Sequence, residues 1–167
     1  MPDNVFSLNS FYKYINLFLM KRKFSLLLLA FLLIISALNT SCKEREETVN
    51  CFPKVPINVT LNLSLPAYFN LQSVGGWIYL NQQESGTRGL IVVKTSTGFN
   101  IYDRNAPHIC PGNDTTLIVE NNIKITCPAD GAEWILLTGQ PTKISPIPPK
   151  TYRYNFDSGT NILIIFE

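Results

Sequence analysis

Two short stretches of the sequence carry side chains that could bind a metal ion. The first reads "RNAPHICPGN" and contains His108, the only histidine of the chain, and Cys110. The second reads "CPADG", begins at Cys127 and includes Asp130. Thiolate and imidazole groups suit iron and zinc, and the H-x-C…C-x-x-D spacing is similar to that of a four-ligand zinc site. The residue types therefore raise the hypothesis of a metal centre.

The elements that must position these stretches are β-strands. Residues 57–65, "INVTLNLSL", alternate apolar and polar side chains without a break, which is the period of a half-buried strand. Further strand candidates follow at intervals of roughly ten residues, with turn signals such as "ESGTRG" and "DSG" between them. These candidates are 76–80, 89–94, 99–103, 116–119, 123–126, 133–137, 152–156 and 161–166. No window of helical length has a 3.6-residue apolar stripe, so the pattern predicts an all-β fold, a small antiparallel β sandwich or barrel.

The N-terminal part of the chain has the layout of a secretory signal. Residues 20–41 read "MKRKFSLLLLAFLLIISALNTS", with basic residues, then an apolar run, then small and polar residues. The apolar run is shorter than the roughly 20 residues of a bilayer span. Cys42 follows directly, and "LNTSC" resembles the lipobox of bacterial lipoproteins, in which the cysteine is acylated. We therefore expect lipidation at Cys42; an ordinary signal peptide with an incidental cysteine is the alternative.

This signal divides the chain into four parts. Residues 1–19 are expected to be an upstream extension from a wrongly assigned start, 20–41 a lipoprotein signal peptide, 42–54 a tether and 55–167 the β domain. The tether begins "KEREE", which resembles the charged export signal of surface lipoproteins in Bacteroidetes-type bacteria; a solvated linker is the alternative. The predicted location is the bacterial cell envelope, lipid-anchored at the outer membrane, with surface exposure as a further expectation.

The charge of the mature chain argues against nucleic acid as a partner. Four of the 14 Lys and Arg residues and one of the 12 acidic residues precede Cys42. The mature chain thus carries 10 basic and 11 acidic side chains, so the basicity of the full sequence belongs to the leader. The expected partners are the membrane, through the lipid anchor, and an unknown envelope protein or glycan.

The order of elements around the two stretches resembles the Rieske iron–sulfur domain. In that family a C-x-H loop and a C-P-x-H-G loop, each after a strand, hold a [2Fe–2S] cluster, and a Pro loop follows. "PIPPKTY" (146–152) resembles that Pro loop without its usual G-P-A triplet. The resemblance covers roughly residues 55–167 in layout and is specific over 102–139. The matching residues are Pro107, His108, Cys127, Pro128, Gly131, Trp134, Thr138 and Gly139.

Two ligand positions of the family are altered in this chain. Ala106 stands where the first ligand cysteine is expected, and Asp130 stands where the second ligand histidine is expected. A Rieske centre needs two thiolates on one iron and two imidazoles on the other, and the chain has a single histidine. We therefore expect no cofactor and no metal. If a metal is bound, the candidate ligands are His108, Cys110, Cys127 and Asp130, holding a [2Fe–2S] cluster or a single iron or zinc ion.

The resemblance also implies a disulfide. In the quinol-oxidising branch of the Rieske family a disulfide links the two cluster loops, and its first cysteine lies shortly after the ligand histidine, as Cys110 follows His108. In an exported protein a cysteine pair is more often a disulfide than a metal site. These considerations predict a Cys110–Cys127 bridge. Cys51 is then left as a free thiol near the tether or as a partner of another chain.

The remaining chemistry-bearing residues support no enzyme. Asp130 and Glu133 could act as an acid–base pair, but no nucleophile–base pair accompanies them, and solvated loop acids are the simpler interpretation. The aromatic residues are expected mostly in the core, with an exposed cluster that binds sugar or peptide as the alternative. The predicted function is that of an envelope-anchored lipoprotein whose Rieske-like domain has lost its cluster and has a structural or binding role. The alternative is an electron-transfer protein with a non-standard ligand set.

Overall fold

The computed structural model describes residues 48–167, which form strands and one 3₁₀ helix. The predicted signal, Cys42 and the first part of the expected tether lie outside the described residues. No helix in the described part is long and apolar enough to cross a bilayer. The elements in chain order are β1 (Asn58–Asn62), η1 (Pro66–Gln72), β2 (Trp77–Leu80), β3 (Leu90–Lys94), β4 (Phe99–Asp103), β5 (Ile118–Glu120), β6 (Lys124–Thr126), β7 (Glu133–Ile135), β8 (Pro141–Lys143), β9 (Arg153–Asp157) and β10 (Ile162–Phe166).

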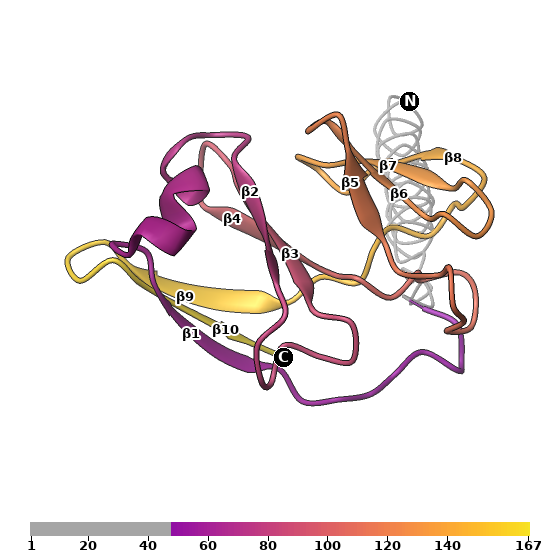
Figure 1. The fold of residues 1–167 in the computed structure, drawn as a ribbon, viewed down its shortest axis with the longest axis horizontal. Coiled ribbons are helices and arrows are strands. Elements are labelled where there is room, and N and C mark those ends of the chain that lie inside the picture. Colours follow the sequence, from indigo (N-terminus) through magenta and orange to yellow (C-terminus); the bar gives the residue numbers. More distant parts are fainter. Residues whose placement is uncertain (1–47) are drawn as a thin grey trace, which may run out of the picture. The chain divides into compact units, whose positions relative to one another are not determined.

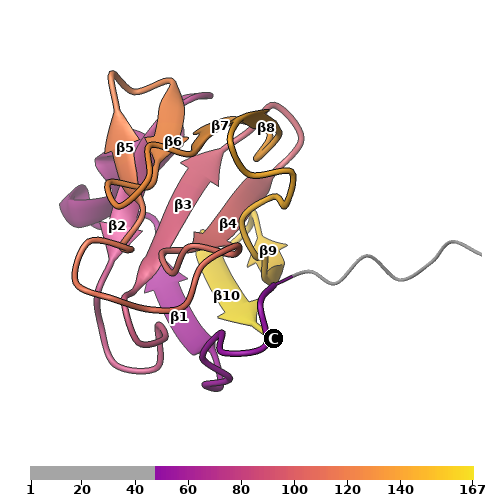
Figure 2. The same cartoon turned by 90° about the vertical axis from the view of Figure 1, so that its right-hand side faces the viewer.

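The strands form three antiparallel sheets (Figures 1 and 2). The first has the order β1-β10-β9, the second β2-β3-β4, and the third β5-β6-β7-β8. The first sheet joins the two ends of the described chain, because β1 pairs with β10 from Asn58↔Phe166 to Asn62↔Ile162. The third sheet is a run of hairpins that carries the second of the two chemistry-bearing stretches. The predicted antiparallel all-β class is therefore confirmed.

Strand β3 separates two hydrophobic cores. All of its residues from Leu90 to Val93 are fully buried. Leu90 and Val92 pack into one core with β1 and β10, whereas Ile91 and Val93 face the other core, around Trp134. A strand that is covered on both faces needs apolar residues at consecutive positions, which is why "LIVV" shows no alternation. In contrast, β1 alternates because only one of its faces is buried.

Two elements were not predicted from the sequence. Helix η1 begins with Pro66, whose fixed φ suits the first helical position, and it buries only Leu71, so no apolar stripe identifies it. Strand β8 begins with Pro141 and lies at the edge of its sheet. Proline is tolerated at an edge because it has no ladder hydrogen bond to donate there.

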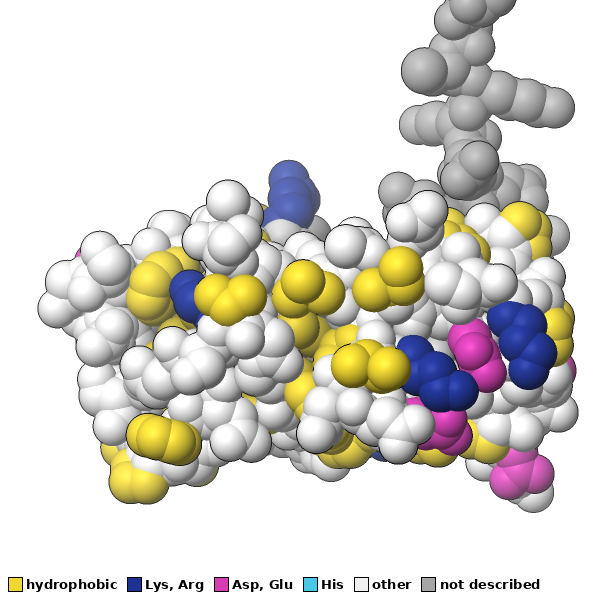
Figure 3. Space-filling view, turned by 90° about the horizontal axis from the view of Figure 1, so that it is seen from above, with side chains coloured by type: hydrophobic (Ala, Val, Ile, Leu, Met, Phe, Trp, Pro, Cys, Tyr) yellow, Lys and Arg dark blue, Asp and Glu magenta, His cyan; other side chains and the backbone are white. Residues whose placement is uncertain are grey.

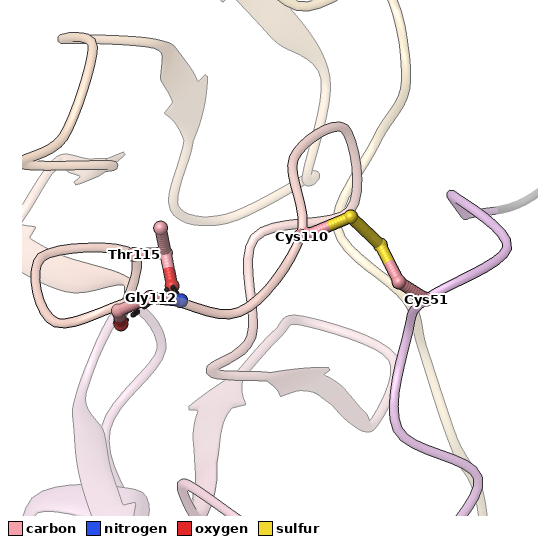
Figure 4. The surroundings of a disulfide bond; sticks show 4 residues. All are labelled: Cys51, Cys110, Gly112 and Thr115. Carbon is pink, nitrogen blue, oxygen red and sulfur yellow. Dashed lines mark hydrogen bonds between the residues drawn. A yellow bond between two sulfur atoms is a disulfide. The ribbon is translucent and has the colours of Figure 1, made fainter.

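The structure pairs the cysteines differently from the prediction. Cys51 is bonded to Cys110, with the Cα atoms 5.5 Å apart (Figure 4). Cys127 is the free cysteine among the described residues and is fully buried. The predicted Cys110–Cys127 bridge is therefore wrong, and Cys51 is not a free thiol. The physical reason is burial: the Cys127 side chain belongs to the core around Trp134, whereas Cys110 is exposed on its loop.

The segment that carries Cys51 packs on the domain. The Val49 amide donates to the Pro107 carbonyl at 2.9 Å, and the Phe52 amide closes a turn onto the Val49 carbonyl. Phe52 is only 5% exposed. The described part of the expected tether is thus held against the loop that carries His108.

We predict that peptide mapping without reduction will recover Cys51 linked to Cys110, with Cys127 modified by alkylating reagents only after denaturation. The bridge joins positions 59 residues apart, and closing a loop of that length stabilises a fold by about 4 kcal/mol in the chain-entropy model. We therefore expect the Cys51→Ser/Cys110→Ser double variant to lose about 2–5 kcal/mol of unfolding free energy in urea titrations. Recovery of a Cys110–Cys127 peptide would contradict this pairing.

Candidate metal centre

Two loops carry the candidate ligands. The first, residues 104–117, joins β4 to β5, and the second, residues 127–132, joins β6 to β7. The ends of the first loop are held together because the Leu117 amide donates to the Arg104 carbonyl at 2.7 Å. Arg88 also donates to the Thr116 hydroxyl and the Gly112 carbonyl on this loop. The loop that carries His108 is therefore fixed at its base as well as by its disulfide.

The second loop is a tight turn that Gly131 makes possible. Gly131 has a φ of +74°, a conformation that residues with a Cβ rarely adopt. Its amide donates to the Cys127 carbonyl at 2.8 Å, and the Cys127 amide donates to the Ala132 carbonyl at 2.9 Å. The Ala132 amide donates to Asp130 Oδ1 at 3.0 Å. These bonds fix the Asp130 side chain and leave its other oxygen, Oδ2, free to meet the first loop.

The structure brings together three of the four predicted candidates. His108 Nε2 and Asp130 Oδ2 are 2.6 Å apart. Ligand atoms of His108, Cys127 and Asp130 all lie within 4.8 Å of one another. Cys110 is not part of this group, because its sulfur is bonded to Cys51. The site therefore offers one imidazole, one thiol and one carboxylate.

Burial and hydrogen bonds set the charges of this group. Burial acts to raise the pKa of Asp130, but the hydrogen bonds from His108, the Ala132 amide and Cys127 outweigh it, so that the pKa is lowered. The Asp130 carboxylate thus stabilises the fold at neutral pH, and this contribution is lost as the pH falls through its lowered pKa. Burial raises the pKa of the Cys127 thiol, with a smaller contribution from neighbouring Asp130. A buried, protonated thiol is a poor nucleophile, which argues against reading the group as a Cys–His–Asp catalytic triad.

The donor set does not fit a [2Fe–2S] cluster. Rieske-type ligation needs two thiolates and two imidazoles. Ala106, where the sequence resemblance led us to expect the first thiolate, is 2% exposed and packs in the same apolar core as Cys127. Cys110 is oxidised in its disulfide, and the chain has one histidine. The described loops therefore supply one thiol and one imidazole, half of the set.

The wall behind the site is aromatic. The rings of His108 and Trp134 lie 5.5 Å apart between centroids, and Trp134 Nε1 donates to the Ile147 carbonyl at 2.8 Å. Ile147 belongs to the proline-rich segment that the sequence places after the two loops. His108 Nδ1 is buried and has no hydrogen-bond partner among the described residues. One nitrogen of the imidazole is thus satisfied by Asp130 and the other is not.

Asp130 and Glu133 do not act on each other as a matched acid–base pair. Glu133 Oε1 lies 3.0 Å from Lys124 Nζ and 3.6 Å from Lys143 Nζ, whereas Asp130 is bonded to His108. Figure 3 shows charged side chains gathered at the right-hand end of one face, the end of the molecule where Figure 1 places β5–β8. Glu133 is thus part of a solvated ion-pair group on that sheet.

A groove that the sequence did not locate lies between η1 and β2. This groove has a volume of about 690 Å³, and among the described residues no Asp, Glu, Lys or Arg side chain lines it. Phe69 is 75% exposed at its side, and Trp77 Nε1 donates to Asn122 Oδ1 at 3.0 Å. The only sequence signal for it is the "GGW" turn before β2. Its lining residues are Phe69, Asn70, Ser73, Gly75, Gly76, Trp77, Ile78, Tyr79 and Asn122.

The comparisons with known proteins give a structural similarity alone. No protein-family model matches the chain, and no curated protein does. Among solved structures, the chain is similar to the ferredoxin of carbazole 1,9a-dioxygenase from Nocardioides aromaticivorans IC177, with a TM-score of 0.38 and 16% sequence identity. The alignment covers 68% of this chain and 97% of that ferredoxin. A similarity of this size assigns neither a family nor an activity.

Proposed function

We propose that this chain is a cell-envelope lipoprotein, anchored through Cys42, whose Rieske-like β domain has lost its iron–sulfur cluster and has a structural or binding role. One observation carries the loss of the cluster: the two described loops bring together one free thiol, Cys127, and one imidazole, His108, where the cluster needs two of each. The Cys51–Cys110 disulfide joins the first loop to the N-terminal segment. A covalent bridge and the bonds of Arg88 thus hold a loop that a cluster would otherwise organise. The altered positions Ala106 and Asp130 support the same reading.

Electron transfer through a non-standard ligand set is the less supported candidate. That set would consist of His108, Cys110, Cys127 and Asp130, and it needs the Cys110 thiolate. In the disulfide this sulfur carries no thiolate charge. Reduction of the bridge would therefore have to precede assembly of a cluster. An oxidising envelope disfavours that step.

The absence of a cluster is directly testable. We predict that the protein, expressed in its native host and purified anaerobically, will be colourless and will contain no stoichiometric iron or acid-labile sulfide. The physical reason is that one thiol and one imidazole cannot complete the four ligands of the cluster. A brown protein with visible absorption bands and two irons per chain would overturn the proposal. A ferredoxin that carries a cluster, purified in parallel, controls for loss of iron during purification.

The lipid anchor predicts a change of compartment when Cys42 is replaced. In the Cys42→Ser variant we expect the protein to leave the membrane fraction and to lose incorporation of labelled fatty acid, because two or more acyl chains are what hold such a protein at a bilayer. Thr48→Ser, a conservative change in the tether that leaves every cysteine in place, is the control and should keep both properties. Membrane retention of Cys42→Ser at the level of the wild type would contradict the anchor.

The groove between η1 and β2 supports the binding role. An exposed aromatic ring beside amide and hydroxyl side chains, with no charged side chain in the lining, suits an uncharged, hydroxyl-rich ligand. We therefore propose an envelope glycan as the partner at this groove. Beyond Asn122 the surface next to the groove is apolar, because Ile123 is 67% exposed there.

We predict that Phe69→Ala will retain at least tenfold less neutral envelope polysaccharide than the wild type in a pull-down with the purified protein. The lost stacking surface is the physical cause. Ile144→Ala, which also removes an exposed apolar side chain (59% exposed) but does not line the groove, should bind like the wild type. Equal retention by Phe69→Ala and the wild type would contradict the assignment of the groove.

A further inference from the structure

We propose that His108, Cys127 and Asp130 bind a single divalent metal ion of the zinc type, with one coordination position left open to solvent. This inference goes beyond the proposed function and rests on the absence of the iron–sulfur cluster from the two loops. His108 comes from the first loop and Cys127 and Asp130 from the second, yet their ligand atoms lie within 4.8 Å of one another. Thiolate, imidazole and carboxylate are the ligand types of zinc sites in proteins.

The loops hold the donors without the metal. Asp130 is fixed through its Oδ1 by the Ala132 amide, so that Oδ2 faces His108. Cys127 is fixed by the turn that its own amide and carbonyl close. Partners that orient the ligands in this way raise metal affinity, because less order has to be gained when the ion binds.

The exposure of the donors differs from one side of the group to the other. The Cys127 residue is fully buried, the His108 side chain is 10% exposed and the Asp130 side chain is 28% exposed. An ion bound among them would be sealed on the thiolate side and open on the carboxylate side. Three protein ligands with an open fourth position is the arrangement of zinc sites that take water or another small ligand.

The unsatisfied nitrogen of His108 is the second observation that points to a ligand. Its side chain is nine-tenths buried, and Nδ1 has no partner among the described residues. Buried polar atoms of this kind are rare, and an absent ion or water is a common cause. Either ring nitrogen can coordinate a metal. Asp130 Oδ2 lies 2.6 Å from Nε2, so an ion that both residues coordinate binds at Nε2 and takes the place of the proton between them. That proton passes to Nδ1, the ring nitrogen that has no partner among the described residues.

Binding is a balanced exchange of one proton for the ion. In the metal-free protein Cys127 is a free, buried thiol. Coordination forms the metal–sulfur bond and breaks the S–H bond, and the proton leaves to solvent. A single soft thiolate with one imidazole favours Zn²⁺, Co²⁺ or Fe²⁺ over Mg²⁺ and Ca²⁺, which prefer oxygen ligands.

Titration with Co²⁺ tests the site with a spectroscopic probe. The full chain, in its processed form, is stripped with a chelator and titrated with Co²⁺ under anaerobic conditions without a thiol reductant. We expect one equivalent of Co²⁺ to bind with a near-ultraviolet thiolate-to-metal band, and Zn²⁺ to remove that band by displacement. Mg²⁺ should displace nothing at a hundredfold excess.

Variants assign the ligands. Cys127→Ser should lose the thiolate band, and Asp130→Asn should weaken Zn²⁺ binding at least tenfold. Glu133→Gln is the matched control, because this carboxylate lies three residues along the chain and pairs with Lys124 and Lys143; its affinity should equal that of the wild type. If Cys127→Ser does not fold, as judged by circular dichroism, Asp130→Asn on the exposed side of the site decides the question.

Three results would overturn this inference. They are the absence of a thiolate band at millimolar Co²⁺, a band that persists in folded Cys127→Ser, and equal weakening by Asp130→Asn and Glu133→Gln. A protein that binds neither Co²⁺ nor iron refutes the metal site and leaves the cluster-free lipoprotein standing. A protein isolated with a [2Fe–2S] chromophore refutes the proposed function itself.

Discussion

The Cys51–Cys110 disulfide is the constraint on which the rest of the candidate site depends. It takes the sulfur of Cys110, two residues after His108 in the sequence, out of the set of possible ligands and joins the first loop to the N-terminal segment. The Val49–Pro107 hydrogen bond and the buried Phe52 reinforce the same junction. Because the first loop is fixed, His108 meets Asp130 across the gap between the loops at 2.6 Å.

The site is apolar at its buried base and polar at its exposed rim. At its base, Ala106 and Cys127 pack with Trp134 in the second hydrophobic core, where the contacts between the loops are apolar. At its rim, Asp130 keeps a lowered pKa because of its hydrogen bonds with His108, the Ala132 amide and Cys127. The His108–Asp130 contact joins the two loops, and the disulfide fixes the first loop to the N-terminal segment. Neither the Cys127 thiol nor the Nδ1 nitrogen of His108 takes part in these links.

The alternation of "INVTLNLSL" was sufficient to predict β1, because one face of that strand is buried and the other is solvated. The two loops were also identifiable, since their residue types and spacing are local features of the sequence. The disulfide partner was not predictable, because pairing joins positions 59 residues apart and depends on how the N-terminal segment returns to the domain. The groove beside Phe69 was missed for a similar reason: η1, β2 and the turn at Asn122 meet only in the folded chain.

The most direct test of the account is a crystal structure of the processed protein, with anomalous diffraction data collected at the iron edge. The account predicts continuous electron density between the sulfurs of Cys51 and Cys110, a separate Cys127 thiol in the core, and no anomalous iron peak between the two loops. Two iron peaks between His108 and Cys127, with Cys110 reduced and facing them, would contradict it.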